Sequence, residues 1–349
     1  MPGVANVPGR PSAIGRIGAP RRLRVLLGLS FFLLASCSGQ LSALDPAGPG
    51  AARIARLWWL LFWVATVAFA SVLGLIAFAL RRARRDVTPD IDTEPVAWGD
   101  RFIGIAGVAV PVVILLGGFV YSLDQMNALA TGDADDPGLE IEIVAHNWWW
   151  EVRYPNGAVT ANEIHIPTGE RIRLRLTTAD VIHSFWVPRL QAKMDHVPGM
   201  ENEMWLQADE PGTYRGQCAE FCGLQHAHMA FFVEAQPPGD FQAWYDGQAS
   251  VASEPEDPSA ERGLVVFLSS SCVGCHAIGG TEATATTGPD LTHLASRRTL
   301  FAGRLPNTRQ NLESIIVDPQ HVKPGVGMPP TEMGAADLAA LLDYLEALD

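Results

Sequence analysis

The chain has 349 residues, with 25 Lys or Arg, 38 Asp or Glu and a formal net charge of −13. Apolar residues make up 48% and charged residues 18%, which excludes an acidic disordered protein and argues against a purely soluble enzyme. The acidic balance argues against nucleic-acid binding, which requires a basic surface. The charge is uneven, because residues 1–85 hold 11 Arg and one acidic residue. A basic, apolar N-terminal part is typical of membrane targeting.

An 11-residue apolar run, Val25 to Ala35, follows three arginines between positions 21 and 24. It is too short to span a bilayer and has the form of a secretory signal peptide, which we assign to residues 1–36. The run ends in Leu34-Ala35-Ser36-Cys37, which resembles the lipobox of bacterial lipoproteins. This resemblance implies cleavage before Cys37 and lipidation of that residue. The alternative is ordinary cleavage nearby, which would leave a spare thiol.

Two uncharged stretches, Leu57–Leu80 and Phe102–Leu123, are long enough to cross a membrane. The first has 24 residues, or about 36 Å of helix. The second contains Pro111, which transmembrane helices tolerate. Four arginines between 81 and 85 separate them, and the positive-inside rule places this loop in the cytoplasm. We predict a transmembrane hairpin over 57–124, preceded by an extracytoplasmic segment over 37–56. A buried hairpin of a soluble protein would have to hide both runs and the arginines.

After Asp124 the sequence changes to short apolar stretches separated by turns such as Pro155-Asn156-Gly157. Arg171–Leu176 alternates strictly, which is typical of a half-buried strand. Several short strands joined by such turns predict a β-sandwich or barrel, here over residues 125–236. The expected strands are Leu139–Ala145, Arg171–Thr178, Glu203–Ala208 and Met229–Ala235.

The densest group of metal-ligating residues is Cys218, Cys222, His226 and Met229, which lie within 12 residues. Soft sulfur ligands combined with imidazole suit copper in electron transfer. His183, about 35 residues upstream, could complete the site if both loops meet at one end of a β-sandwich. Closed coordination would leave no open position for a substrate, so such a site would carry electrons.

Structural zinc, a disulfide and mononuclear blue copper are the alternatives to a binuclear copper site. Structural zinc prefers four Cys or His ligands, often with two residues between the cysteines, whereas here three separate them and Met is a poor zinc ligand. A disulfide between Cys218 and Cys222 would be possible in an oxidising compartment. Mononuclear blue copper needs one Cys and would leave the second thiolate unused. Two thiolates that bridge two copper ions use every ligand.

The pattern Cys-x-Glu-x-Cys-Gly-x-x-His-x-x-Met, with an upstream His-Ser-Phe, resembles subunit II of the haem–copper cytochrome c oxidases. The resemblance covers roughly residues 55–235, including the helical anchor. It implies a cupredoxin domain that holds the binuclear copper A centre with two copper ions. The ligands that it implies are His183, Cys218, Glu220 through its backbone carbonyl, Cys222, His226 and Met229.

The same resemblance implies two further roles. Trp148, in His146-Asn147-Trp148-Trp149-Trp150, matches the tryptophan at which electrons enter, although family members commonly have Gln where Asn147 stands. Packing in a core or an interface is the alternative for these tryptophans. The Glu220 side chain would face a magnesium ion at the interface with subunit I, since a carboxylate suits a hard cation.

The C-terminal part contains Cys272-Val273-Gly274-Cys275-His276, a c-type haem attachment motif. Cys272 and Cys275 would form thioethers to the haem, and His276 would be one axial ligand of the iron. Met328 lies 52 residues after His276 in a Met-Pro context and is the expected second axial ligand, which raises the haem potential. Met333 and, more weakly, His321 are its rivals.

Residues 260–349 resemble a single-haem class I cytochrome c, joined to the β-domain by a Pro-rich linker over 237–259. In that family the terminal helix, here Ala335–Leu348 with Tyr344, packs on the helix that holds Gly263 and Phe267. The expected fold class is thus a multi-domain membrane protein with a two-helix hairpin, an all-β cupredoxin sandwich and an all-α cytochrome c domain.

Together these resemblances imply the electron-input subunit of a proton-pumping cytochrome c oxidase in a bacterial inner membrane, with its copper and haem domains on the periplasmic side. Its implied partners are subunit I, which reduces oxygen to water, other oxidase subunits, and a soluble donor such as cytochrome c or the preceding respiratory complex. No catalytic residues are expected in this chain.

Three alternatives differ in class. A quinol-oxidase subunit would keep the β-domain as a structural module, but such relatives lack the copper ligands. A copper-delivery lipoprotein would have no use for a fused haem. Nitrous oxide reductase has a similar copper centre but is soluble and needs a large catalytic domain.

Overall fold

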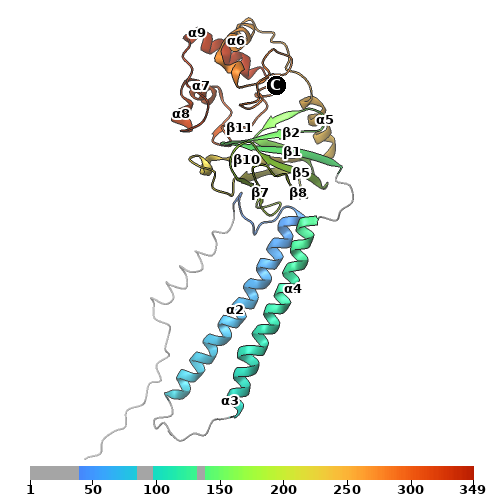
Figure 1. The fold of residues 1–349 in the computed structure, drawn as a ribbon, viewed down its shortest axis with the longest axis vertical. Coiled ribbons are helices and arrows are strands. Elements are labelled where there is room, and N and C mark those ends of the chain that lie inside the picture. Colours follow the sequence, from blue (N-terminus) through green and yellow to red (C-terminus); the bar gives the residue numbers. More distant parts are fainter. Residues whose placement is uncertain (1–38, 85–96, 132–137) are drawn as a thin grey trace, which may run out of the picture. The chain divides into compact units, whose positions relative to one another are not determined.

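The computed structural model describes residues 39–84, 97–131 and 138–349 (Figure 1). The expected signal peptide, residues 1–36, and the expected lipidation site, Cys37, lie outside the described residues. So does Arg85, the last of the four arginines in the loop between the apolar runs.

Two long helical segments carry the apolar runs. Helix α2 (Pro49–Ala83) starts at Pro49 rather than at Leu57, because the fixed φ of proline favours the first turn of a helix. The second segment consists of α3 (Ala97–Phe102), η2 (Ile103–Ala109) and α4 (Val110–Thr131). Residues Pro49–Ala83 and Trp98–Ala130 are each about 50 Å long, enough to cross a bilayer, and the apolar windows within them are fully exposed in this chain.

Segment η2 has the wider turns of a π-helix and ends at Ala109, just before Pro111. Proline cannot donate a backbone hydrogen bond, and its ring crowds the carbonyl one turn earlier. Wider turns before a proline relieve that clash without breaking the helix.

The outer ends of both helices are tied to the β-domain by backbone groups. The amide of Ala51 donates to the carbonyl of Leu190 at 2.9 Å, and the amide of Ala47 donates to that of Arg189 at 2.7 Å. The Trp205 indole donates to the carbonyl of Leu129, near the end of α4, at 2.9 Å. Contacts between α2 and α4 complete the predicted hairpin.

The β-domain consists of two main sheets and a small hairpin. The first sheet has strand order β3-β2-β1-β5-β8, the second has order β4-β10-β9, and β6 pairs with β7. The pairs β1–β5 and β4–β10 are parallel, and the other pairs are antiparallel. The strands are β1 (Leu139–His146), β2 (Trp149–Arg153), β3 (Val159–Ala161), β4 (Glu163–Pro167), β5 (Ile172–Thr178), β6 (His183–Phe185), β7 (Met194–His196), β8 (Asn202–Leu206), β9 (Gly212–Gln217) and β10 (Ala230–Gln236).

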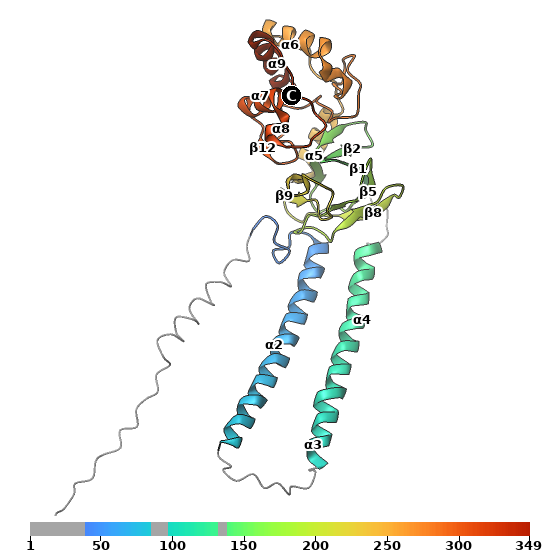
Figure 2. The ribbon, with the colours of Figure 1, turned by 60° about the vertical axis from the view of Figure 1, so that its left-hand side comes forward.

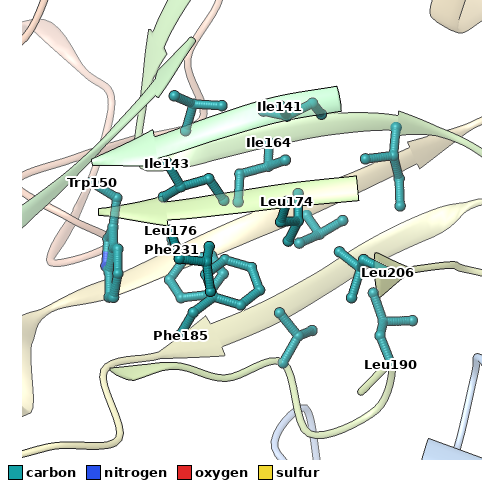
Figure 3. Close-up of a cluster of buried hydrophobic side chains, with 14 of the residues drawn as sticks. Ile141, Ile143, Trp150, Ile164, Leu174, Leu176, Phe185, Leu190, Leu206 and Phe231 are labelled. Atoms are coloured by element: carbon teal, nitrogen blue, oxygen red, sulfur yellow. The ribbon is translucent and has the colours of Figure 1, made fainter. Parts of the chain in front are cut away.

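The core of this domain lies between the two main sheets, as Figure 3 shows. The alternating pattern of β5 is confirmed, because Ile172, Leu174 and Leu176 are buried while the arginines between them are not. Near one end, the rings of Phe185 and Phe231 stack with centroids 4.5 Å apart, and Trp150 meets both edge-on. This aromatic cluster supports the end of the sandwich at which the loops carrying the cysteines emerge.

The expected linker is partly structured. Helix α5 (Pro238–Gln248) packs on the β-domain, where the Trp244 ring stacks on His165 with centroids 3.9 Å apart. Asn156 donates its side-chain amide to the carbonyl of Tyr245 at 2.6 Å. The segment without regular structure between the two domains is therefore shorter than 237–259.

The C-terminal domain is mainly helical (Figure 2). Helix α6 packs closely on α9 as expected, because Gly263 has no side chain: a Cβ there would lie 2.0 Å from the carbonyl oxygen of Ala340. Beside this crossing, the rings of Phe267 and Tyr344 lie 6.3 Å apart. The elements are α6 (Pro258–Ser269), η4 (Ser271–Gly274), β11 (Thr299–Leu300), β12 (Leu305–Pro306), α7 (Arg309–Val317), α8 (Pro319–Val322) and α9 (Ala335–Glu346).

Candidate electron-transfer sites

The cysteines of the β-domain lie where two chain segments meet at one end of the sandwich. Cys218 and Cys222 occupy the loop after β9, and His183 is the first residue of β6. His226 begins the short helix η3 (His226–His228), and Met229 follows it directly. The fold thus brings together all the side chains that the sequence predicted as copper ligands.

The distances within this group are short. The two thiol sulfurs are 3.8 Å apart, with His183 Nδ1 at 3.9 Å from Cys218 Sγ and His226 Nδ1 at 3.7 Å from Cys222 Sγ. Met229 Sδ lies 3.8 Å from Cys222 Sγ. A disulfide requires about 2.05 Å between its sulfurs, so the two cysteines are free thiols.

His183 is held in place by Asp180. The Asp180 carboxylate lies 2.7 Å from His183 Nε2 and also accepts the backbone N–H of Asn147 at 2.6 Å. This contact leaves Nδ1 facing Cys218, the arrangement in which a carboxylate fixes the ring of a metal-binding histidine. Burial alone would lower the pKa of His183, but the hydrogen bonds and charges of Asp180 and Cys218 together outweigh burial and raise that pKa.

The two thiols share their protonation. A hydrogen bond from Cys222, assisted by His183, lowers the pKa of the Cys218 thiol, while the same hydrogen bond raises the pKa of the Cys222 thiol. One thiolate is therefore favoured before any metal binds. A metal that binds both sulfurs must displace the second proton.

The donor set suits copper. His183, Cys218 and Cys222 could hold a metal ion, since their ligand atoms lie within 4.8 Å of one another and all three residues are buried. Adding the Met229 sulfur makes the set rich in soft donors, which favour copper over hard cations. The backbone oxygen of Glu220, 3.2 Å from Cys218 Sγ, also faces the group.

The Glu220 side chain, in contrast, points away from the sulfurs and is 45% exposed. Its carboxylate lies 3.7 Å from Lys193 Nζ, which is also 3.5 Å from Asp195. A cation that binds this carboxylate would therefore compete with Lys193 for it.

In the C-terminal domain, the attachment motif opens onto a cavity of about 270 Å³. Cys272, Cys275 and His276 line one part of it, and Met328 lines another. The carbonyl of Pro289 lies 2.8 Å from His276 Nδ1, which leaves Nε2 free for a metal. Burial lowers the pKa of His276 and so favours the neutral imidazole that an iron ligand requires.

The lining of this cavity fits a haem. Met328 is the one of the three candidate second ligands that lines it. Gly288 is required beside His276, because a Cβ there would lie 2.8 Å from the imidazole ring. Arg297 is a buried cation in the wall, and Thr299 Oγ1 is buried there without a hydrogen-bond partner in the protein. Polar groups of this kind suit the carboxylates of a haem.

The cavity also borders the β-domain, because Trp148, Trp149 and Asn162 contribute to its lining. Trp148 donates its indole N–H to the carbonyl of Cys222 at 2.9 Å. Lys323, in the C-terminal domain, donates from Nζ to the carbonyl of Trp148 at 2.7 Å. The tryptophan that the sequence predicted as an electron-transfer residue therefore lies between the two candidate sites.

Sequence reasoning missed Asp180, Arg297 and Lys323. Asp180 lies three residues before His183, a spacing that could have suggested a supporting carboxylate. Lys323 is one of only two lysines in the chain, which was a weak signal. Arg297 stands in an ordinary Arg-Arg pair that gave no signal of burial.

Comparison with known proteins agrees with this geometry. Residues 158–236 match the family described as cytochrome c oxidase subunit II, periplasmic domain, and residues 260–349 match cytochrome c. Cytochrome c oxidase subunit 2 of Alkalihalophilus pseudofirmus is 38% identical over 332 residues, covering 92% of this chain and 96% of that protein. The subunit of the same name from Bacillus subtilis is 30% identical over 346 residues, covering 94% and 97%.

Quinol oxidase subunit 2 of Bacillus cereus is 32% identical over 230 residues, which cover 64% of this chain and 78% of that protein. The matches to the two bacterial cytochrome c oxidase subunits are longer than this one and extend into the C-terminal domain. The chain belongs to the family of cytochrome c oxidase subunit 2 and carries a fused cytochrome c domain.

Proposed function

We propose that this chain accepts electrons from a soluble donor at its cytochrome c domain and delivers them, through its copper site, to the oxygen-reducing subunit I of a proton-pumping oxidase. One observation carries the proposal: the protein joins the two sites by direct contact. Gly325, near Met328, lies against the Trp148 ring, and Trp148 is hydrogen bonded to Cys222.

The proposed copper ligands are the six that the family match implies. A binuclear copper centre held there supplies a one-electron carrier that needs little rearrangement. The chain contributes rigidity, because His183 and Met229 adjoin strands β6 and β10 and the aromatic core lies beneath them. It also excludes water, since Cys218, Cys222, Met229 and His183 are almost fully buried. These ligands are His183, Cys218, Glu220, Cys222, His226 and Met229.

For the C-terminal site we propose one haem attached to Cys272 and Cys275, with His276 and Met328 as axial ligands. A His–Met pair raises the haem potential, which suits a carrier that delivers electrons to an oxidase. The position of Met328 in the cavity wall supports it over Met333 and His321.

The surroundings of the chain follow from the same reading. We propose a bacterial inner membrane, with the end of α2 that carries Arg81 and Arg82 on the cytoplasmic side and both cofactor domains on the periplasmic side. Cytochrome c or the preceding respiratory complex would be the donor. At the Glu220 carboxylate, a magnesium ion would bind on the interface with subunit I.

The two remaining alternatives are disfavoured by particular features. A quinol-oxidase subunit needs neither the buried thiol pair nor the cavity beside Cys272. A copper-delivery protein must release its metal, whereas most of these donors are buried and they come from two segments of one rigid domain.

Anaerobic rapid mixing of the purified oxidase with reduced soluble cytochrome c tests the proposal. We expect the c-type haem to be reduced first and the near-infrared band of mixed-valence copper to bleach afterwards. The double variant Cys272→Ala/Cys275→Ala, which cannot attach haem, should slow the bleaching strongly. Copper reduction at the wild-type rate in that variant would contradict the proposed route.

A further inference from the structure

Lys323 is unusual in its position. The chain has 23 arginines but only two lysines, and Lys323 is 2% exposed although its side chain ends in an amine. It directly follows α8, in the cytochrome domain. Burying a charge is costly unless hydrogen bonds replace the lost water, so a fully buried lysine indicates a specific requirement for its donors.

The two acceptors of Lys323 belong to different domains. Its Nζ donates to the carbonyl of Trp148 in the β-domain at 2.7 Å and to the carbonyl of Phe301, in the β11–β12 turn of the cytochrome domain, at 3.1 Å. Neither acceptor is a carboxylate, and burial lowers the pKa of the Lys323 amine to about 7. The amine links two backbone segments across the domain boundary, and in its protonated form these hydrogen bonds are charge-assisted and stronger than those between neutral groups.

The residues after Lys323 extend the same contact. The carbonyl of Pro324 accepts a hydrogen bond from the Gln225 side chain at 2.6 Å. Gly325 has φ of +86° and sits so close to the β-domain that a Cβ would lie 2.9 Å from the Leu224 side chain and 3.7 Å from the Trp148 ring. Leu224 and Gln225 belong to the loop between Cys222 and His226, so this contact reaches the copper loop itself.

Hydrogen bonds within the cytochrome domain also connect this contact to Met328. The Gln320 side chain accepts the amide of Gly325 at 2.8 Å and donates to the carbonyls of Val326 at 2.8 Å and Met328 at 3.1 Å. These hydrogen bonds hold loop 323–328, including Met328, in one conformation. A displacement of Lys323 would therefore also shift Met328 relative to Trp148.

A second contact between the domains is more exposed. Arg298, 56% exposed, lies 3.2 Å from Glu234, and its backbone amide donates to Glu163 at 2.7 Å. That contact joins the domains through Glu163 and Glu234, whereas Lys323 joins them through Trp148.

We propose that Lys323 is a positioning residue that fixes the Met328-bearing loop of the cytochrome domain against Trp148 and so sets the rate of electron transfer from haem to copper. This inference rests on the proposed function. Its physical basis is that electron transfer between fixed carriers slows steeply as the gap between them widens.

The test compares Lys323→Met with Arg262→Met in the assembled oxidase. Arg262, in α6 of the same domain, is 58% exposed and pairs with Asp337, so its variant removes the same charge without touching the domain boundary. Three quantities are measured: hydrogen exchange of peptides 221–226 and 320–328, the haem potential, and the rate of haem-to-copper electron transfer after flash reduction of the haem.

For Lys323→Met we expect about tenfold faster exchange in both peptides and about tenfold slower electron transfer, since a charge-assisted bond across a boundary contributes about that factor to docking. The Met–iron absorption and the copper near-infrared band should stay unchanged. The haem potential should not rise, because Lys323 lines the haem cavity and losing a cation there favours the oxidised haem; a lower potential would by itself speed transfer to copper. Arg262→Met should behave as wild type. A raised haem potential or a lost Met–iron absorption in Lys323→Met would indicate a disturbed cytochrome domain and would overturn the positioning role, as would wild-type exchange and transfer rates.

Amine labelling of the wild-type oxidase tests the burial of Lys323 without any variant. We expect Lys323 to react at least about tenfold more slowly in the native enzyme than after denaturation in detergent. Equal rates would overturn the proposal. If wild type shows no haem-to-copper transfer at all, the proposed function fails, whereas the exchange and labelling results still report on Lys323 separately.

Discussion

The two candidate cofactor sites are built in different ways. The copper site takes Cys218, Cys222, His226 and Met229 from one short segment and needs only His183 from elsewhere. The haem cavity draws its walls from residues 271–345 and also from Trp148, Trp149 and Asn162 of the other domain. A local site is preformed by its own loop, whereas a distributed site depends on how the domain folds and docks.

The largest effect should come from breaking the local site. Cys218→Ser removes one of the two sulfurs that we propose hold copper, so we expect loss of the near-infrared copper band and of at least about 99% of turnover with reduced cytochrome c. The haem should remain covalently attached, as visible spectra of the denatured protein will show. Retained turnover in Cys218→Ser would show that electrons do not pass through the cysteine pair.

A change in the haem cavity should alter the haem potential. Met328→Ala removes the proposed axial sulfur, and we expect the haem potential to fall by on the order of 0.1 V or more and turnover to fall with it. Met333→Leu is the matched control and should keep the wild-type potential. A lowered potential in Met333→Leu, with Met328→Ala normal, would assign the ligand to Met333 instead. Spectroelectrochemistry measures both.

The fold of the haem domain depends on one close helix crossing. Gly263→Leu would drive its side chain into the carbonyl of Ala340, which lies 2.0 Å from the position of a Cβ, and into Tyr344. We expect the free energy of unfolding of this domain to fall by about 3 kcal/mol or more. Gly247→Ala, in helix α5 outside this domain and with nothing within 4 Å of a Cβ, should leave the melting of the haem domain unchanged. Thermal melting followed at the haem band distinguishes these outcomes.

The smallest effect concerns acid stability of the β-domain. Burial lowers the pKa of His165 to about 4, from an ordinary value of 6.5. As the pH falls below 6.5, His165 becomes protonated in the unfolded chain but stays neutral in the folded chain. The free energy of unfolding therefore decreases until the pH reaches about 4. Between pH 7.5 and pH 5 we expect a loss of about 2 kcal/mol from this residue.

His165→Gln should flatten that dependence of the free energy of unfolding on pH, while His321→Gln, at an exposed position, should keep the wild-type slope. Denaturant titrations of the purified protein at several pH values measure it. An unchanged slope in His165→Gln would show that other groups cause the acid sensitivity.

The difference between the sites also explains what the sequence could predict. The ligands around Cys218 and the motif at Cys272 were recognisable because their spacing is local, and the strands around Ile172–Thr178 followed from alternation. Paired contacts such as Lys323 with Trp148 join residues 175 positions apart, and no local pattern encodes such pairs. For the same reason, the sequence did not indicate that Trp148 would be covered by loop 323–328.

Two further differences between the predicted and the observed elements also arise from tertiary contacts. Helix α5 lies within the segment that was expected to be a linker, and its packing through Trp244 on His165 is a tertiary contact that no local pattern encodes. The strand β9 (Gly212–Gln217) was missed, because glycine and polar residues weaken its alternation and it gains its order from pairing with β10.

The central claim is that two thiolates hold two copper ions as one electron carrier. Electron paramagnetic resonance of the oxidised oxidase tests it most directly. The account predicts an unpaired electron shared equally by two copper nuclei, and a hyperfine pattern that disappears in Cys218→Ser. A pattern from a single copper nucleus in the wild-type enzyme would contradict it.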